Sequence, residues 1–141
     1  MLLSGCGGGG IHDPRLSALP LAPGVRIVTN VRRCDHGTNP YCALQMVAVG
    51  PKYGSSRQLM TAERNVLHAH GWSGTDPSTG EEFADDSPGH KLRVTYSTPY
   101  GDLKGIDLDW IERAPQIGRS LALALFHGTP AISIELQSGS Q

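Results

Sequence analysis

The chain of 141 residues lacks a long hydrophobic run, because no stretch approaches the 18 consecutive apolar residues that indicate a transmembrane helix. It also lacks an excess of positive charge, since 12 Lys and Arg are offset by 13 Asp and Glu, for a formal net charge of -1. Nucleic-acid-binding proteins usually carry a clustered positive face, so this balance excludes nucleic acid as an expected partner. No catalytic signature and no strong metal or phosphate motif is present. The sequence therefore predicts neither a reaction nor a cofactor.

The composition is that of an ordinary globular protein, with 38% hydrophobic residues and charges of both signs. This length leaves room for one domain of about 100–120 residues once an N-terminal tail is set aside. The 18 glycines and 10 prolines fall mostly between periodic segments, as expected for a compact fold with long connections.

Cysteine is scarce, with three residues in the chain, and two of them lie close together. Cys34 and Cys42 flank a turn-rich segment, and we predict a disulfide that closes a hairpin-like loop. A loop this short is stabilised by about 2.5 kcal/mol in the chain-entropy model. The alternative is a metal site with Cys34, His36 and Cys42 as ligands, but this spacing matches no common zinc pattern and a fourth ligand is not evident.

The third cysteine, Cys6, follows Leu3-Ser4-Gly5 and precedes four glycines, Gly7 to Gly10. Leu3-Ser4-Gly5-Cys6 resembles the lipobox of bacterial lipoproteins, and the glycines resemble the flexible tether that follows a lipidated cysteine. The resemblance implies acylation of Cys6, with two or more acyl chains because one chain gives marginal anchoring. It also implies a location at the extracytoplasmic face of the bacterial cell envelope. The alternative is a cytosolic chain with a free thiol near its N-terminus.

Only five residues precede Cys6, which is too short for a secretory signal, so this interpretation places the translation start upstream. Residues 1–24 are then a signal remnant with the lipobox and tether, because prolines at 14, 20 and 23 favour extended chain. Residues 25–141 form the single domain.

Hydrophobic periodicity predicts the secondary structure of that domain. Alternation of Val25, Ile27, Thr29 and Val31 indicates an edge strand with these residues on its buried face. A helix is expected to begin at Ser55 and to stop at Gly71, with Trp72 packed on its last turn. A second helix is expected from Pro115 to about His127; it is apolar nearly all round, which is typical of a well-covered helix. The other predicted strands are 43–49, 91–97, 106–110 and 132–137, with the start of a short helix as the alternative at 106–110. Residues 98–102 are predicted to form a turn.

From residue 43 onward this order is βαββαβ, the pattern of a ferredoxin-like fold. We therefore predict an α+β two-layer sandwich with an extra N-terminal edge strand, in which both helices cover one face of the sheet and the other face is wet.

Residues 73–90 are predicted to form a long loop rich in acidic side chains. The loop is a candidate calcium site, but it does not follow the EF-hand order, and a solvated loop is favoured. Its candidate oxygen donors are Asp76, Glu81, Glu82, Asp85 and Asp86.

Other polar residues are candidates for function. His68 and His70 are two apart on a helix and are expected to point to different sides, one near the core edge and the other into solvent. Asp107 and Asp109 could form a carboxylate pair, although the wet side of a strand is the simpler interpretation. The candidate ligand surface combines the wet sheet face with loop residues. It comprises Asp35, His36, His90, Arg93 and Thr95.

Two hypotheses follow. The first is a lipid-anchored binding or accessory module with an unidentified protein or small-molecule ligand. The second is a small metal-dependent or hydrolytic enzyme whose site forms from Asp35, His36, His90 and the acidic loop.

Overall fold

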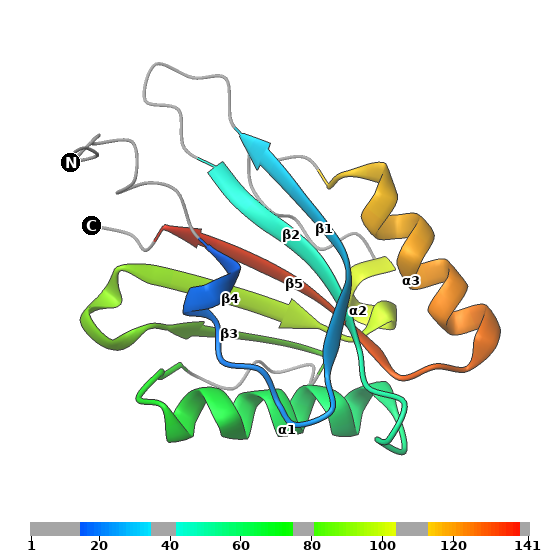
Figure 1. The fold of residues 1–141 in the computed structure, drawn as a ribbon, viewed down its shortest axis with the longest axis horizontal. Helices are drawn as coiled ribbons and strands as arrows, with labels where there is room; N and C mark the ends of the chain where they lie inside the picture. Colours follow the sequence, from blue (N-terminus) through cyan, green and yellow to red (C-terminus); the bar gives the residue numbers. More distant parts are fainter. Residues whose placement is uncertain (1–14, 35–41, 75–80, 104–112, 139–141) are drawn as a thin grey trace.

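The computed structural model describes residues 15–34, 42–74, 81–103 and 113–138. These residues form a five-stranded antiparallel sheet, in the order β1-β2-β5-β4-β3, with helices packed against it (Figure 1). The strands are β1 (Arg26–Cys34), β2 (Cys42–Val49), β3 (Glu82–Asp86), β4 (Leu92–Ser97) and β5 (Ala131–Ser138). The helices are α1 (Ser56–Ala69), α2 (Pro99–Leu103) and α3 (Pro115–His127), with short 3-10 turns at Leu16–Ala18 and Pro88–His90.

The two long helices begin and end at the predicted signals. The Ser55 side chain accepts a hydrogen bond from the Gln58 backbone N–H at the start of α1, and Gly71 follows the helix with a φ of 87°. The Trp72 backbone N–H donates to the Leu67 carbonyl, and the Trp72 ring is buried. Helix α3 begins at Pro115 and ends at Gly128, whose φ of 68° suits a glycine C-cap.

The α+β class is confirmed, but the two-layer arrangement is wrong, because α1 and α3 pack on opposite faces of the sheet. Successive side chains of a strand point to opposite faces. On β2, Met46 and Ala48 belong to the hydrophobic cluster that contains α1 residues. Val47 and Val49 belong to a second cluster with Ile117 and other α3 residues. The nearly continuous apolar sequence of β2 is thus explained by a helix on each side.

The ferredoxin-like topology is not confirmed. Strand β5 lies between β2 and β4, and every pairing is antiparallel, so β2 and β3 run in opposite directions although α1 joins them. A split βαβ unit would require these two strands to be parallel. The direction of β3 explains the difference from a ferredoxin-like fold. After α1, Ser73 pairs with Asp86 at the C-terminal end of β3, whereas Glu81 lies at the N-terminal end, so the strand runs back toward Ser73.

Three segments differ from their predicted structure. Strand β3 lies inside the predicted loop 73–90, and α2 replaces a predicted turn. The predicted strand 106–110 lies outside the described residues. Residues 15–24, assigned from the sequence to the spacer, pack on the domain, since Leu19 and Ala22 are buried. The short apolar stretch around Leu19 has no periodicity that would have indicated this.

Strand β1 contains a bulge that the alternating pattern did not predict. The register shifts between Ile27 and Thr29, so Val28 is the extra residue. Ile27 packs with the α1-side cluster, whereas Val31 packs with the α3-side cluster. The prediction that Ile27, Thr29 and Val31 share one face is therefore wrong.

The predicted disulfide is confirmed. Cys34 and Cys42 face each other in the antiparallel register of β1 and β2, with their Cα atoms 4.0 Å apart, and their sulfur atoms are bonded. The bond ties the two strands together at the end of the hairpin where β1 ends and β2 begins, at the edge of the sheet.

Candidate functional site

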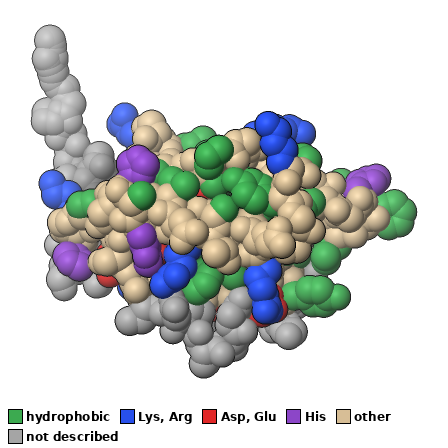
Figure 2. Space-filling model, turned by 90° about the horizontal axis from the view of Figure 1, so that it is seen from below, with side chains coloured by type: hydrophobic (Ala, Val, Ile, Leu, Met, Phe, Trp, Pro, Cys, Tyr) green, Lys and Arg blue, Asp and Glu red, His purple; other side chains and the backbone are tan. Residues whose placement is uncertain are grey.

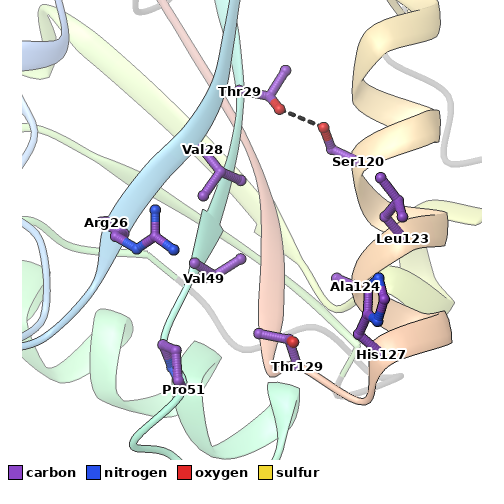
Figure 3. A pocket seen from close by; sticks show the side chains of 10 residues that line it. All are labelled: Arg26, Val28, Thr29, Val49, Pro51, Ser120, Leu123, Ala124, His127 and Thr129. Atoms are coloured by element: carbon purple, nitrogen blue, oxygen red, sulfur yellow. Dashed lines mark hydrogen bonds between the residues drawn. The ribbon is translucent and has the colours of Figure 1, made fainter.

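A surface groove lies between the bulged part of β1 and the C-terminal half of α3 (Figure 3). Its volume is about 390 Å³. The side chains on its two long walls come from β1 and α3, and residues at the end of β2 and before β5 close its lower end. The lining residues are Arg26, Val28, Thr29, Val49, Pro51, Ser120, Leu123, Ala124, His127 and Thr129.

The bulge in β1 builds the wall of the groove. In a regular strand, without a bulge at position 28, Arg26 and Thr29 would point to opposite faces because they are three positions apart. With it, both line the groove, and the Thr29 and Ser120 hydroxyls are joined by a hydrogen bond at its upper end. This contact fixes the middle of α3 to the edge strand.

The side chains that line the groove are mainly apolar, and those that are charged or ionisable are basic. Aliphatic side chains of Val28, Val49 and Leu123 form much of its surface, with Arg26 from β1 and His127 from α3 as its titratable groups. None of its lining residues is Asp or Glu. Such a combination suits a ligand that has an apolar part and an anionic group.

The outer face of α3 extends this apolar surface beyond the groove. Leu123 is 57% exposed and Phe126 is 84% exposed, and the Phe126 ring lies 5.2 Å from the His127 ring, centroid to centroid. At the end of the molecule where α3 ends, hydrophobic and histidine side chains stand out from the surface (Figure 2). The prediction of a well-covered α3 is therefore wrong, because its apolar outer residues face solvent. Apolar positions opposite the buried stripe of a helix were the sequence signal for this surface.

A second polar cluster is centred on Asp85, which is buried on β3 beneath α1. The Tyr96 hydroxyl donates to Asp85 Oδ2 at 2.5 Å, and His68 Nε2 lies 2.8 Å from Asp85 Oδ1. Burial raises the pKa of Tyr96 far above its usual range, and the hydrogen bond and negative charge of Asp85 add to the rise. These contacts connect α1, β3 and β4, so we assign the cluster to the stability of the fold.

Glu63 is the other buried acid on this side of the sheet. It accepts a hydrogen bond from the Ala22 backbone N–H at 2.8 Å, and so holds residues 15–25 against α1. Burial raises the pKa of Glu63 to about 8, although the Ala22 hydrogen bond opposes the shift. Glu63 Oε2 has no hydrogen-bond partner within the described parts of the chain.

The candidate ligand surface predicted from the sequence does not coincide with the groove. Asp35 and His36 lie outside the described residues. His90 is exposed on the β3–β4 turn, with Nδ1 3.7 Å from Asp86 Oδ2, and Arg93 Nη1 lies 3.4 Å from Asp86 Oδ1. Thr95 lies further along β4, opposite Ala84 and Glu135. The structure thus brings His90 and Arg93 together around Asp86.

The predicted histidine geometry is confirmed, because His68 is half-buried against Asp85 while His70 is exposed and bonds its own helix at the Val66 carbonyl. The acidic segment is not a gathered set of donors. Asp85 is committed to Tyr96 and His68, and Glu81 Oε2 pairs with Arg57 at 2.5 Å. In the described ranges there is no cluster of three or more His, Cys, Asp or Glu that could hold a metal ion. Asp76, Asp107, Asp109 and Cys6 lie outside those ranges.

The fold and the groove define an α+β protein with an antiparallel sheet between two helical layers and a basic, apolar surface groove at the sheet edge. A scan against models of protein families found no match, and searches of curated proteins and of solved structures found none either. Within the described residues, no helix has the length and apolar character needed to cross a membrane.

Proposed function

We propose that this protein is a lipid-anchored, extracytoplasmic binding module of the bacterial cell envelope, which holds its ligand in the groove between β1 and α3. The lipid is attached at Cys6, and the folded domain begins a short distance after the glycine tether. The proposal combines the lipobox resemblance with the geometry of the groove.

The observation that carries the proposal is the disulfide between Cys34 and Cys42. Disulfides persist in oxidising compartments and are rare in the cytosol, so the bond supports export. Two of the three cysteines are thereby paired with each other, which leaves Cys6 as the odd one. An odd cysteine in an exported protein requires an explanation, and lipidation provides it.

The groove supports binding as the function of the domain. Ligand sites are typically concave and mostly apolar, with a few polar groups that orient the ligand. Arg26 and His127 stand on facing walls above the aliphatic surface, where an anionic group of the ligand would be held. The alternative hypothesis, a metal-dependent or hydrolytic enzyme, has no comparable support, because His90 is exposed and its nearest acidic partner is Asp86 across the turn.

Mass spectrometry of the protein recovered from the membrane fraction of its native host tests the anchor. We expect an N-terminal peptide that begins at a diacylated Cys6. Thiol titration of the untreated full-length chain tests the compartment, and we expect Cys34 and Cys42 to react only after reduction. An unmodified Cys6 in protein found only in the cytosol, or a freely reactive downstream pair, would refute the proposal.

A further inference from the structure

We infer that the groove and the outer face of α3 bind an anionic membrane surface. This inference rests on the proposed function, since it identifies the partner of the same groove. The surface consists of the groove together with Arg119 and Phe126, and we call it the α3 face.

The apolar part of the α3 face projects outward, which a ligand confined to the groove would not cover. Phe126 is the most exposed large hydrophobic residue of the described chain, and it lies outside the groove lining. Three of the five exposed large hydrophobic residues in the described parts belong to the α3 face: Val28, Leu123 and Phe126. The interfacial region of a bilayer can take up a protruding aromatic ring because it adapts to the shape of the surface that enters it.

Helix geometry places these side chains on one stripe. Arg119, Leu123 and Phe126 occur at i, i+4 and i+7, and so share a face of α3. The buried residues Ile117, Leu121 and Ala124 form the opposite stripe. A long cationic side chain one turn before two exposed apolar side chains can reach lipid headgroups while the apolar side chains enter the interface.

The charge of the α3 face selects an anionic surface. Neither β1 nor α3 contains an Asp or Glu, whereas Arg26 and Arg119 carry permanent positive charge. The acidic residues of the described chain lie elsewhere, for example in β3, whose sequence is EFADD. The whole chain has a net charge of -1, so the α3 face is positive because the fold brings basic residues together there and places acidic residues elsewhere. Each basic residue near an anionic membrane strengthens binding by about fivefold.

The test uses the full chain with Cys6→Ser, so that no acyl chain can carry the binding, and with the Cys34–Cys42 disulfide intact. Sedimentation is measured with vesicles of phosphatidylcholine alone and of equal parts phosphatidylcholine and phosphatidylglycerol. We expect binding to the anionic vesicles, weakening with salt, and little binding to the neutral ones.

Variants locate the binding surface. We expect Phe126→Ala to lower the affinity for anionic vesicles about tenfold and Arg119→Gln about fivefold. The matched control is Leu125→Ala, which also removes an exposed apolar side chain from α3. Leu125 is 42% exposed but lies outside the α3 face, about 160° around the helix axis from Leu123. Its affinity should match that of the parent chain.

Three results would overturn the inference. The first is equal affinity of the parent and the Phe126→Ala chain for anionic vesicles, or no affinity of either. The second is a dimer in sedimentation equilibrium that Phe126→Ala dissociates, which would make a second copy the occupant. The third is saturable binding of monomeric decanoate without vesicle binding, which would assign the groove to a small amphiphile. None of these affects acylation of Cys6 in the native host, so the anchor and the membrane face fail separately.

Discussion

Replacement of Glu63 by Gln should remove a pH dependence of stability that the fold imposes on the protein. Glu63 is 1% exposed, and burial raises its pKa from 4.5 to about 8 in the folded state. Glutamine has almost the same shape, and its carbonyl oxygen can still accept the Ala22 N–H. The substitution therefore removes the titration and keeps the contact that holds residues 15–25 to α1.

The sign of the effect follows from the raised pKa. Below pH 4.5 the carboxyl is protonated in both states and contributes no pH dependence. Between pH 4.5 and about 8 the folded state retains a proton that the unfolded state releases, so the free energy of unfolding falls as pH rises. Each pH unit in this range lowers the free energy of unfolding by about 1.4 kcal/mol, so the loss over the whole range is on the order of a few kcal/mol.

The assay is urea unfolding of the oxidised protein at pH values from 5 to 9, followed by circular dichroism. Other titrating groups are common to both chains, so their effects cancel in the difference between parent and variant. We expect similar stability at pH 5 and a Glu63→Gln chain that is more stable by several kcal/mol at pH 8.5. Asn65→Asp, which adds an exposed carboxyl to the same helix, is the control and should show no such slope. A parent and a Glu63→Gln chain with parallel pH profiles would refute the assignment of a buried, protonated Glu63.

The other predictions concern backbone approach, the cross-link and the Asp85 cluster. Gly74→Ala should lower the free energy of unfolding by about 1–3 kcal/mol, because the new Cβ would lie 1.9 Å from the Ala84 carbonyl oxygen. The control is Gly118→Ala, whose Cβ would meet no atom within 4 Å and which should be neutral or stabilising. Thermal melts in which Gly118→Ala is the less stable of the two variants would contradict this prediction. Double replacement of Cys34 and Cys42 by Ser should cost about 2.5 kcal/mol in urea unfolding, and an unchanged midpoint would be inconsistent with a bond that constrains the unfolded chain. Tyr96→Phe should cost about 1.5–3 kcal/mol, because Asp85 loses the donor at 2.5 Å; a neutral result would show that Asp85 does not depend on this bond.

Local signals predicted the elements that depend on neighbouring residues. The Ser55 cap, the stop at Gly71 and the Pro115–Gly128 bounds of α3 were predicted because capping and left-handed glycine conformations involve residues a few positions apart. The Cys34–Cys42 bond was predicted because the two cysteines lie eight positions apart and a hairpin brings them together.

Pairing between segments that are distant in the chain decided the strand order and the presence of β3, which sequence patterns did not predict. Strand β5 lies at the centre of the sheet, where Ala131 pairs with Val49, 82 positions earlier in the chain. No local sequence pattern specifies a pairing between residues so far apart. Strand β3 was missed because its acidic sequence lacks alternation, and it forms because β4 offers a partner and Tyr96 and His68 satisfy the buried Asp85.

The groove belongs wholly to the tertiary structure. A single bulged residue, Val28, moves Thr29 to the side of α3, where it meets Ser120. An alternating sequence specifies two faces of a strand, but a bulge exchanges those faces without leaving a mark in the pattern. The sequence by itself determined the caps and the cross-linked hairpin, because each depends on residues close together in the chain, and the anchor at Cys6 stays a prediction from the same kind of local pattern. The order of the strands and the basic, apolar face along α3 were decided only when segments distant in the chain packed together.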